Sequence, residues 1–208
     1  MFNVCYACGV YRPDKDIDPA GPFAICPECG YRHLFRRLPL LIVAGASGAG
    51  KTTTLHALTG LVTEAALLES DILWRPAFDT PDTHYRDFFE TWLRLAKNIG
   101  QSGRPVALFG AGFGVPANLA PCVEHRYFSA VHTLALVCDD DALAARLRAR
   151  PAWRGATPEF IAGQLAFNQW FKAHAANQSP PLDLLDTTDA TMTETAAAVA
   201  AWLREHAT

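Results

Sequence analysis

The chain has 208 residues, 50% of them hydrophobic, which is enough for one well-buried α/β domain and a small appended segment. Its formal net charge of −3 gives no overall attraction to nucleic acid, so any such contact would have to be local. No apolar run approaches the roughly 18 residues of a membrane helix, and the first residues, Met1 to Tyr6, lack the basic and apolar regions of a signal peptide, so a cytoplasmic protein without a membrane partner is expected.

Two C-x-x-C pairs near the start predict a zinc ribbon over residues 1–37. The pairs are Cys5 with Cys8 and Cys26 with Cys29; 17 residues separate them and a glycine follows each. This is the spacing of a four-cysteine zinc site, in which each pair forms a tight turn that brings two sulfurs to one tetrahedral metal. Four thiolates leave no position for water, so the zinc is expected to be structural and to supply much of the segment's folding energy. Two disulfides or a redox dithiol are the alternatives.

The segment from Tyr31 to Arg37 is basic and aromatic. Its arginines, Arg32, Arg36 and Arg37, could contact nucleic acid. A connector whose aromatic residues pack on the next domain is the other interpretation of the same residues.

Residues 45–52 read G-x-x-x-x-G-K-T, the phosphate-binding P-loop. An apolar run of strand length precedes the motif at 40–44, and a helix-forming stretch follows to about residue 60. Lys51 is expected to reach the β- and γ-phosphates of a nucleotide, and the hydroxyl of Thr52 to ligate Mg²⁺. The residues expected to contact the nucleotide are Gly45, Ser47, Gly48, Ala49, Gly50, Lys51, Thr52 and Thr53.

A second apolar strand is expected at 65–69, and Asp71 follows its end. An acid at the carboxyl end of a strand beside a P-loop lies where α/β sheets bind ligands. Asp71 could accept a proton from a substrate hydroxyl or hold Mg²⁺ through water, or it could merely cap a turn. Glu69 is the weaker choice for this function, and Trp74 and Arg75 could line the substrate pocket.

The remaining elements alternate as in an α/β domain. A loop at 76–82 precedes a helix from about Thr83 to Ile99, and strands follow at 105–110 and 131–138. The three acids at 139–141 are interpreted as capping the helix at 141–149. Thr157 and the Thr191–Glu194 pair are expected to cap two later helices, with a last strand at 182–186 between those helices.

A lid is predicted at about residues 146–157, where a proline break, arginines and a glycine lie between two helices. Arg146, Arg150 and Arg154 could close over a transferring phosphate, and at least one of them is expected to be catalytic. A solvated basic face is the alternative, and it is the preferred interpretation of Arg148.

On these residues the core resembles the P-loop small-molecule kinases, which include nucleoside monophosphate, gluconate and shikimate kinases and chloramphenicol phosphotransferase. The matching features are the P-loop, Asp71, the stretch 146–154 and the run Leu184 to Thr188 before the final helix. The resemblance implies a three-layer α/β/α fold over residues 38–208, with a five-stranded parallel sheet in the order 2-3-1-4-5. It also implies ATP and Mg²⁺ as cofactors, with Lys51, Asp71, Arg150 and Arg154 as catalytic residues. Strand three lacks the Asp-Gly of nucleoside monophosphate kinases, which puts a phosphate acceptor in doubt, and a zinc ribbon is not a usual part of the group.

The leading hypothesis is therefore an ATP-dependent kinase acting on a hydroxyl of a small molecule, such as a nucleoside or nucleotide. A kinase of nucleic-acid ends, docked through the zinc ribbon, is the second. A non-catalytic nucleotide sensor or regulatory ATPase is the third.

Overall fold

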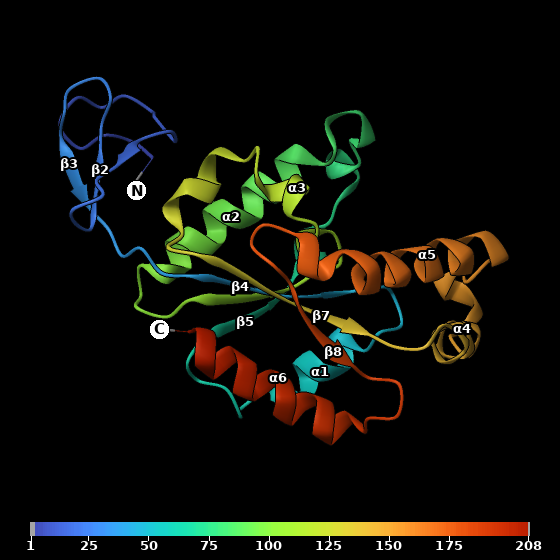
Figure 1. The fold of residues 1–208 in the computed structure, drawn as a ribbon. Helices are drawn as coiled ribbons and strands as arrows, with labels where there is room; N and C mark the ends of the chain where they lie inside the picture. The colour runs from blue at the N-terminus through green and yellow to red at the C-terminus, as the bar shows by residue number, and fades with distance from the viewer. Residues whose placement is uncertain (1–2, 208) are drawn as a thin grey trace.

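A parallel β-sheet forms the centre of this computed structural model, which describes residues 3–207 (Figure 1). The strand order is β5-β6-β4-β7-β8, which confirms the 2-3-1-4-5 order implied by the family resemblance. All pairings between these strands are parallel, so their carboxyl ends meet at one edge of the sheet. The strands are β4 (Leu40–Gly45), β5 (Ala66–Glu69), β6 (Val106–Phe109), β7 (Val131–Val137) and β8 (Asp183–Asp186).

Helices cover both faces of this sheet, and the sequence of β4 shows why. Leu41 and Val43 pack into one core with α1 and α6, whereas Leu40, Ile42 and Ala44 pack into another with α2 and α5. Successive strand residues face opposite sides, so an unbroken apolar run suits a strand that is buried on both. Figure 1 shows α1 and α6 on one side of the sheet and α2, α3 and α5 on the other. The helices are α1 (Lys51–Leu58), α2 (Arg86–Gly100), α3 (Pro116–Leu119), α4 (Asp140–Arg148), α5 (Pro158–His174) and α6 (Met192–His206).

The segment between β5 and α2 differs from its predicted form. The helix expected from about Thr83 begins only at Arg86, because His84 and Tyr85 adopt left-handed conformations with φ of 52° and 56°. Such conformations do not continue a right-handed helix, and they are rare for a bulky residue. Three 3₁₀ turns precede them: η1 (Ser70–Leu73), η2 (Pro76–Phe78) and η3 (Pro81–Thr83).

Two of the three predicted helix caps are formed by side chains. The hydroxyl of Thr157 accepts from Phe160 N at 3.2 Å, and Thr191 with Glu194 forms a capping box. The capping interpretation of the acids after β7 needs correction, because Asp139 makes no side-chain hydrogen bond to the start of α4. Asp140 and Asp141 lie in the first turn, where their charge matches the helix dipole.

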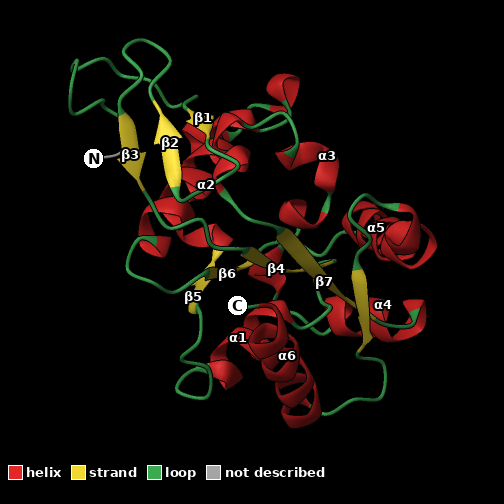
Figure 2. Ribbon diagram, turned by 60° about the vertical axis from the view of Figure 1, so that its left-hand side comes forward, coloured by secondary structure: helices red, strands yellow, loops and turns green. Residues whose placement is uncertain are grey.

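A second, antiparallel sheet lies in the N-terminal segment and contains β1 (Asp16–Ile17), β2 (Phe23–Ile25) and β3 (Arg32–Leu34). Figure 2 shows this small sheet beside α2 and apart from the parallel sheet. Ala24 and Phe35 pack on Tyr127 of η5 (Val123–Tyr127), so the segment is attached to the larger domain by an apolar cluster. The boundary at residue 37 stays a prediction.

Among residues 3–207, no helix is long and apolar enough to cross a bilayer. The expectation about a signal peptide rests partly on Met1 and Phe2, which lie outside the described residues.

Candidate functional site

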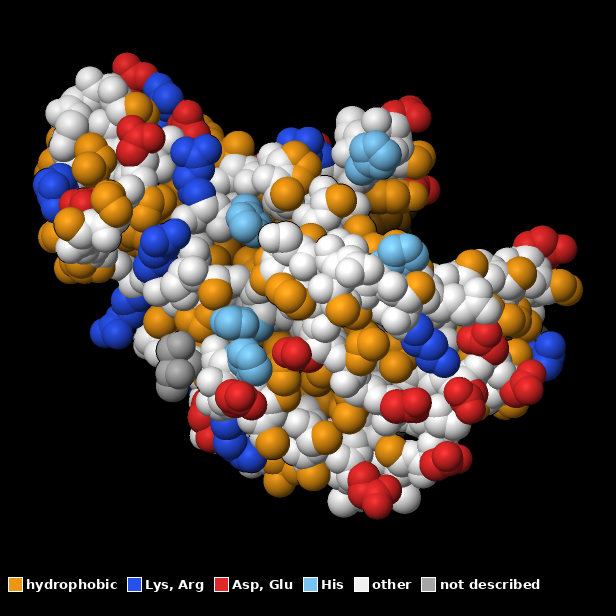
Figure 3. All heavy atoms as spheres, in the orientation of Figure 1, with side chains coloured by type: hydrophobic (Ala, Val, Ile, Leu, Met, Phe, Trp, Pro, Cys, Tyr) orange, Lys and Arg blue, Asp and Glu red, His pale blue; other side chains and the backbone are white. Residues whose placement is uncertain are grey.

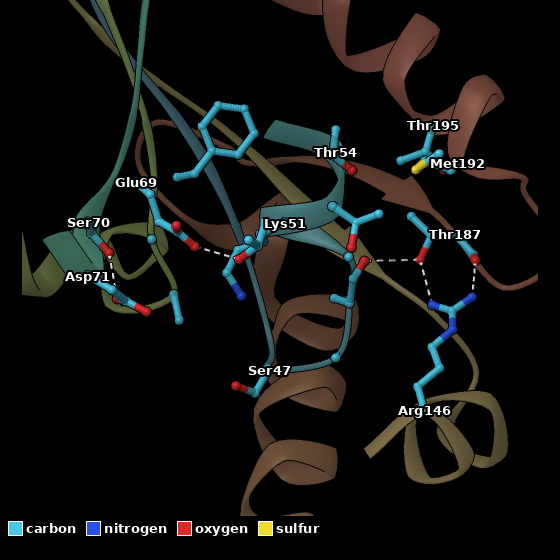
Figure 4. Close-up of a pocket in the computed structure, with 18 of the residues that line it drawn as sticks. Ser47, Lys51, Thr54, Glu69, Ser70, Asp71, Arg146, Thr187, Met192 and Thr195 are labelled. Carbon is cyan, nitrogen blue, oxygen red and sulfur yellow. Dashed lines mark hydrogen bonds between the residues drawn. The ribbon is translucent and has the colours of Figure 1, made fainter. Parts of the chain in front are cut away.

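The P-loop joins β4 to α1 and forms the floor of a cavity of about 450 Å³ (Figure 4). Gly45, Gly48 and Gly50 have φ of 136°, 94° and 101°, the region that favours glycine. A loop of this form turns successive N–H groups toward one point, and the positive end of α1 faces the same space. The cavity is lined by residues 47–54, 69–71 and 109–111 and by Arg146, Arg150, Arg154, Thr187, Ala190, Met192 and Thr195.

Lys51 lies at the base of this cavity. Its Nζ donates to two backbone oxygens of the P-loop, at 2.8 and 3.0 Å. Burial lowers the pKa of Lys51 to about 8; Asp71 opposes this shift, Arg150 adds to it, and Glu69 opposes it more weakly. The ammonium group is therefore close enough to two carboxylates and a guanidinium group to respond to their charges.

Two carboxylates line the cavity at the end of β5. The hydroxyl of Thr52 donates to Glu69 Oε1 at 2.5 Å, while Ser70 Oγ donates to Asp71 Oδ1 at 3.2 Å. Thr52 and Glu69 thus present adjacent oxygen atoms, the kind of ligand that Mg²⁺ prefers. The sequence favours Asp71 over Glu69, but spacing along a strand does not show which carboxylate reaches the P-loop, and Glu69 is the one that bonds to Thr52.

The three lid arginines all line the cavity, but they make different contacts. Arg146 donates to Thr187 Oγ1 at 3.2 Å and to the backbone oxygens of residues 187 and 188 at 2.6 and 3.1 Å, so it fixes the loop after β8 (Figure 4). Burial lowers the pKa of Arg150, and the neighbouring charge of Arg154 lowers it further. Arg154 belongs to the turn η6 (Ala152–Arg154). Arg150 and Arg154 therefore bring two cationic groups to one side of the cavity.

Helix α5 holds the P-loop through a residue that sequence reasoning missed. Gln164 Oε1 accepts a hydrogen bond from Ser47 N at 2.7 Å. One turn farther along, the buried Asn168 donates to Cys138 O at 2.7 Å and to Asp140 Oδ1 at 3.1 Å. The two amides, four residues apart on one helix face, connect α5 to the P-loop and to the start of α4.

The four cysteines of the N-terminal segment form a site that fits zinc. Their sulfurs all lie within 4.8 Å of one another, with Cys5 to Cys29 at 3.6 Å and Cys8 to Cys26 at 3.9 Å. Zn–S bonds of about 2.3 Å in a tetrahedron separate the sulfurs by roughly 3.8 Å. The glycine after each pair has a left-handed φ, and its N–H donates to the first cysteine's carbonyl at 2.9 Å. The predicted pair of zinc knuckles is therefore present.

Several charges of the ribbon are already paired. Arg12 contacts Asp14 at 2.8 Å and also Glu28, and Arg32 contacts Asp18 at 2.5 Å. One of the three arginines predicted to contact nucleic acid is thus held by a neighbouring carboxylate.

Neither a family model nor a curated protein sequence matches this chain. Solved structures do match it. A sugar kinase from Janibacter sp. matches over 83% of this chain and 99% of its own, with a TM-score of 0.59 and 18% identity. The fold is that of the P-loop kinases. A gluconokinase from Sinorhizobium meliloti 1021 covers 82% of this chain and 96% of its own, with a TM-score of 0.54 and 17% identity.

A shikimate kinase from Acinetobacter baumannii, in complex with shikimate, covers 81% of this chain and 94% of its own, with a TM-score of 0.51 and 15% identity. Nearly the whole length of each of these P-loop kinases therefore has a counterpart here. About a sixth of the present chain lies outside each match, a share similar in size to the ribbon. At such low identities the likeness concerns the fold alone.

Proposed function

We propose that the protein is an ATP-dependent kinase that transfers the γ-phosphoryl group to a hydroxyl of a small molecule. The observation that carries the proposal is the convergence of Lys51, the Thr52–Glu69 pair and Asp71 on one cavity. These groups match the needs of phosphoryl transfer: a cation for the phosphates, oxygen ligands for magnesium and a carboxylate for the acceptor. The fold supports it, since the matching structures include a sugar kinase, a gluconokinase and a shikimate kinase.

Magnesium, when bound with ATP, would neutralise the charge that develops on the β- and γ-phosphates. In this proposal the hydroxyl oxygen of Thr52 would be a ligand of the ion, and Glu69 would orient that hydroxyl by accepting its hydrogen bond. The P-loop N–H groups and Lys51 bind the phosphate oxygens. Together these contacts would hold the triphosphate in the cavity that Asp71 also lines.

Asp71 is the residue that we assign to the acceptor. It lies at the carboxyl edge of the sheet, where α/β proteins bind ligands, and it lines the same cavity as Lys51. A carboxylate at this position can orient the acceptor hydroxyl and take its proton as the new O–P bond forms.

We assign residues 146–157 to a lid that brings Arg150 and Arg154 to the transferring group. The guanidinium carbon of Arg154 lies 4.8 Å from the ring centre of Trp153, a residue that is 77% exposed. Gly155 has a left-handed φ of 61°, a conformation that a hinge can use. Two guanidinium groups above the phosphoryl group would stabilise the charge of the transition state and exclude water.

Aromatic residues that follow Asp71 suggest the class of acceptor, although the residues that line the cavity do not include them. Trp74 follows Asp71 by three residues and is 47% exposed, and its ring lies 6.1 Å from Tyr85 and 5.2 Å from Phe88. Figure 3 shows the surface hollowed between this projecting segment and α5. Aromatic rings at the edge of a cleft favour ligands with a flat apolar face. In this proposal a hydroxyl compound that carries a ring, such as a nucleoside, contacts the exposed Trp74 with the part that extends beyond the cavity.

The ion pairs of Arg12 and Arg32 favour a small-molecule acceptor over a nucleic-acid end, because they reduce the cationic surface of the ribbon. The carboxylate of Asp71 in the cavity favours a kinase over a nucleotide sensor, because a sensor has no acceptor hydroxyl to orient.

The proposal is tested with γ-labelled ATP and a panel of nucleosides, nucleotides, sugars, aminoglycosides and oligonucleotides. The wild-type protein is expected to label at least one small hydroxyl compound. Lys51→Ala should lower that turnover by roughly 100-fold or more, because a cation on the phosphates is lost. Lys172→Ala is the matched control: Lys172 pairs with Asp139 at 3.7 Å and does not line the cavity, so transfer should continue.

Three results would overturn the proposal. These are label found on oligonucleotides alone, hydrolysis of ATP that no panel member diverts, and the absence of calorimetric heat with Mg²⁺ and ATP.

A further inference from the structure

The zinc ribbon is joined to the larger domain by a polar cluster whose buried members are Asn3, Lys97 and Glu124, and the half-exposed Arg94 pairs with Glu124 at its edge. Lys97 Nζ and Glu124 Oε2 form an ion pair at 2.6 Å, and the two side chains are 2% and 0% exposed. Asn3 completes the pair from the ribbon: its Oδ1 accepts from Lys97 Nζ at 2.6 Å, and its Nδ2 donates to Glu124 Oε1 at 3.0 Å. Arg94 of α2 also donates to Glu124 Oε1, at 2.9 Å, and Lys97 Nζ lies 4.3 Å from the ring centre of Tyr127. A buried ion pair needs such additional contacts, and Asn3 is the residue of the ribbon that bonds to both Lys97 and Glu124.

The backbone of Asn3 belongs to the same hairpin as the first zinc knuckle. Arg12 N donates to Asn3 O at 2.8 Å, and Val4 forms a β-bridge with Tyr11 just inside this closure. Cys5 and Cys8 lie in the turn of the hairpin, so a metal bound to them constrains the two arms that position Asn3. The buried Lys15 secures the base of the hairpin, because its Nζ donates to Asn3 O at 3.2 Å.

The other side of the cluster is α2, and this helix reaches the active site. Lys97 lies on α2, and Trp92 lies five residues earlier, about 7.5 Å away along the helix axis. The fully buried indole of Trp92 donates from Nε1 to Ser70 O at 3.0 Å. Ser70 is the residue between Glu69 and Asp71, and its own hydroxyl donates to Asp71. A shift of α2 would therefore displace the turn that carries Glu69 and Asp71.

We propose that the zinc ribbon positions the acceptor carboxylate: Asn3 fixes Lys97 on α2, and α2 fixes the Ser70–Asp71 turn through Trp92. Asn3, Lys97 and Trp92 are positioning residues in this arrangement, since none of them lines the cavity. The catalytic meaning of the proposal rests on the proposed kinase function, whereas the mechanical connection does not. Loss of metal from the four cysteines would loosen the hairpin, release α2 and disturb Asp71 at a distance.

Hydrogen exchange of the full-length, zinc-loaded chain tests the connection without any acceptor. Asn3→Ala is expected to raise the exchange rate of peptides covering residues 66–78 roughly tenfold. Zinc content should stay at one ion per chain, and ATP affinity should change by less than about twofold, since the P-loop is untouched. Asn98→Ala is the matched control, because Asn98 is an exposed asparagine on the same helix, next to Lys97. Its side chain donates to Arg94 O within α2, and no hydrogen bond links that side chain to the ribbon residues that the structure describes. This variant should leave residues 66–78 unchanged.

A second variant tests the path. Trp92→Phe keeps a large aromatic side chain but removes the bond to Ser70, so it should accelerate exchange at 66–78 by itself. Adding Asn3→Ala to it should then have little further effect at these residues. If Asn3→Ala prevents the ribbon from folding, chelation of zinc from the wild-type and Trp92→Phe proteins gives the same comparison.

Two exchange results would overturn the connection. One is an effect of Asn3→Ala or chelation that stops within α2 and leaves 66–78 unchanged, and the other is an additive effect in the double variant. If transfer activity is found, Asn3→Ala should lower kcat more than it raises the KM for ATP. The exchange result keeps its meaning if no acceptor is found, so failure of the kinase proposal and failure of the connection are distinguishable.

Discussion

At the scale of single residues, Lys51 makes the site dependent on pH. Burial lowers its pKa from an ordinary value of 10.5 to about 8, and a triphosphate binds to the protonated ammonium group. Above pH 8 most of the free protein has lost this proton, so ATP binding must be accompanied by proton uptake and becomes weaker as the pH rises. We expect the affinity for ATP to fall by up to about tenfold per pH unit above pH 8. Calorimetry in buffers of different ionisation enthalpy would measure the proton uptake directly.

Lys51→Arg is the control for this dependence. A guanidinium group stays charged at these pH values, so the variant should bind ATP more weakly throughout but with a flat profile between pH 8 and 9.5. An equal slope in both proteins would assign the pH dependence to another group.

The residues that could be predicted from the sequence are those defined by neighbours along the chain. The P-loop occupies eight consecutive positions and each cysteine pair four, so local spacing identifies them. Glu69 and Gln164 differ, because they reach Thr52 and Ser47 across 17 and 117 residues. Those contacts exist only once the chain has folded. An amide pair at a spacing of four, such as Gln164 with Asn168, is the one local signal that could have drawn attention to α5.

At the scale of elements, the strands and their order were predictable because a covered parallel strand needs an unbroken apolar run. The path of the segment before α2 could not be predicted in the same way. It depends on two left-handed residues and on aromatic contacts with α2. Strain of this kind costs on the order of 1–3 kcal/mol per residue and is typical of ligand-binding segments. Local sequence preference gives no hint of such a conformation at Tyr85, and the enrichment of histidine in the left-handed region is too weak to identify His84.

Substitution by alanine is expected to have opposite effects on stability at two glycines. At Gly114, in the turn η4 (Gly112–Gly114), an added Cβ would lie 2.3 Å from Ala44 Cβ on the central strand and 3.0 Å from the ring of Phe171. Gly114→Ala should therefore lower the free energy of unfolding by about 1–3 kcal/mol or more, because β4 and α5 must shift. In α5, Gly163 has nothing within 4 Å of an added Cβ. Gly163→Ala should raise stability by about 0.5–1 kcal/mol.

Urea unfolding of both glycine variants checks this pair of predictions. If Gly114→Ala and Gly163→Ala lower the free energy of unfolding equally, the close contact of Gly114 with β4 and α5 does not explain the effect, and this pair of predictions is wrong.

At the scale of the whole molecule, the ribbon and the P-loop kinase fold share a buried boundary. The hydroxyl of Tyr127 donates to Pro13 O and accepts from Lys15 N at 3.0 Å, and the ring of Phe35 lies 5.9 Å from the ring of Tyr127. Glu90 of α2 also accepts hydrogen bonds from the first two N–H groups of η5, so the ribbon rests on elements that are tied to each other. Buried polar contacts of this kind stay intact only while both partners are folded.

The shared boundary predicts that the chain unfolds as one unit whose stability depends on zinc. Metal bound to the folded ribbon adds its binding free energy to the native state. If chelation removes about 3 kcal/mol, the midpoint of thermal unfolding should fall by roughly 6–12 °C for a chain of this length. Scanning calorimetry should show a single transition before and after chelation. In the control variant Cys8→Ser/Cys29→Ser, which lacks two of the four ligands, the chelator should have no further effect. A small early transition for the ribbon, followed by a main transition that chelation leaves unmoved, would show that the two parts fold independently.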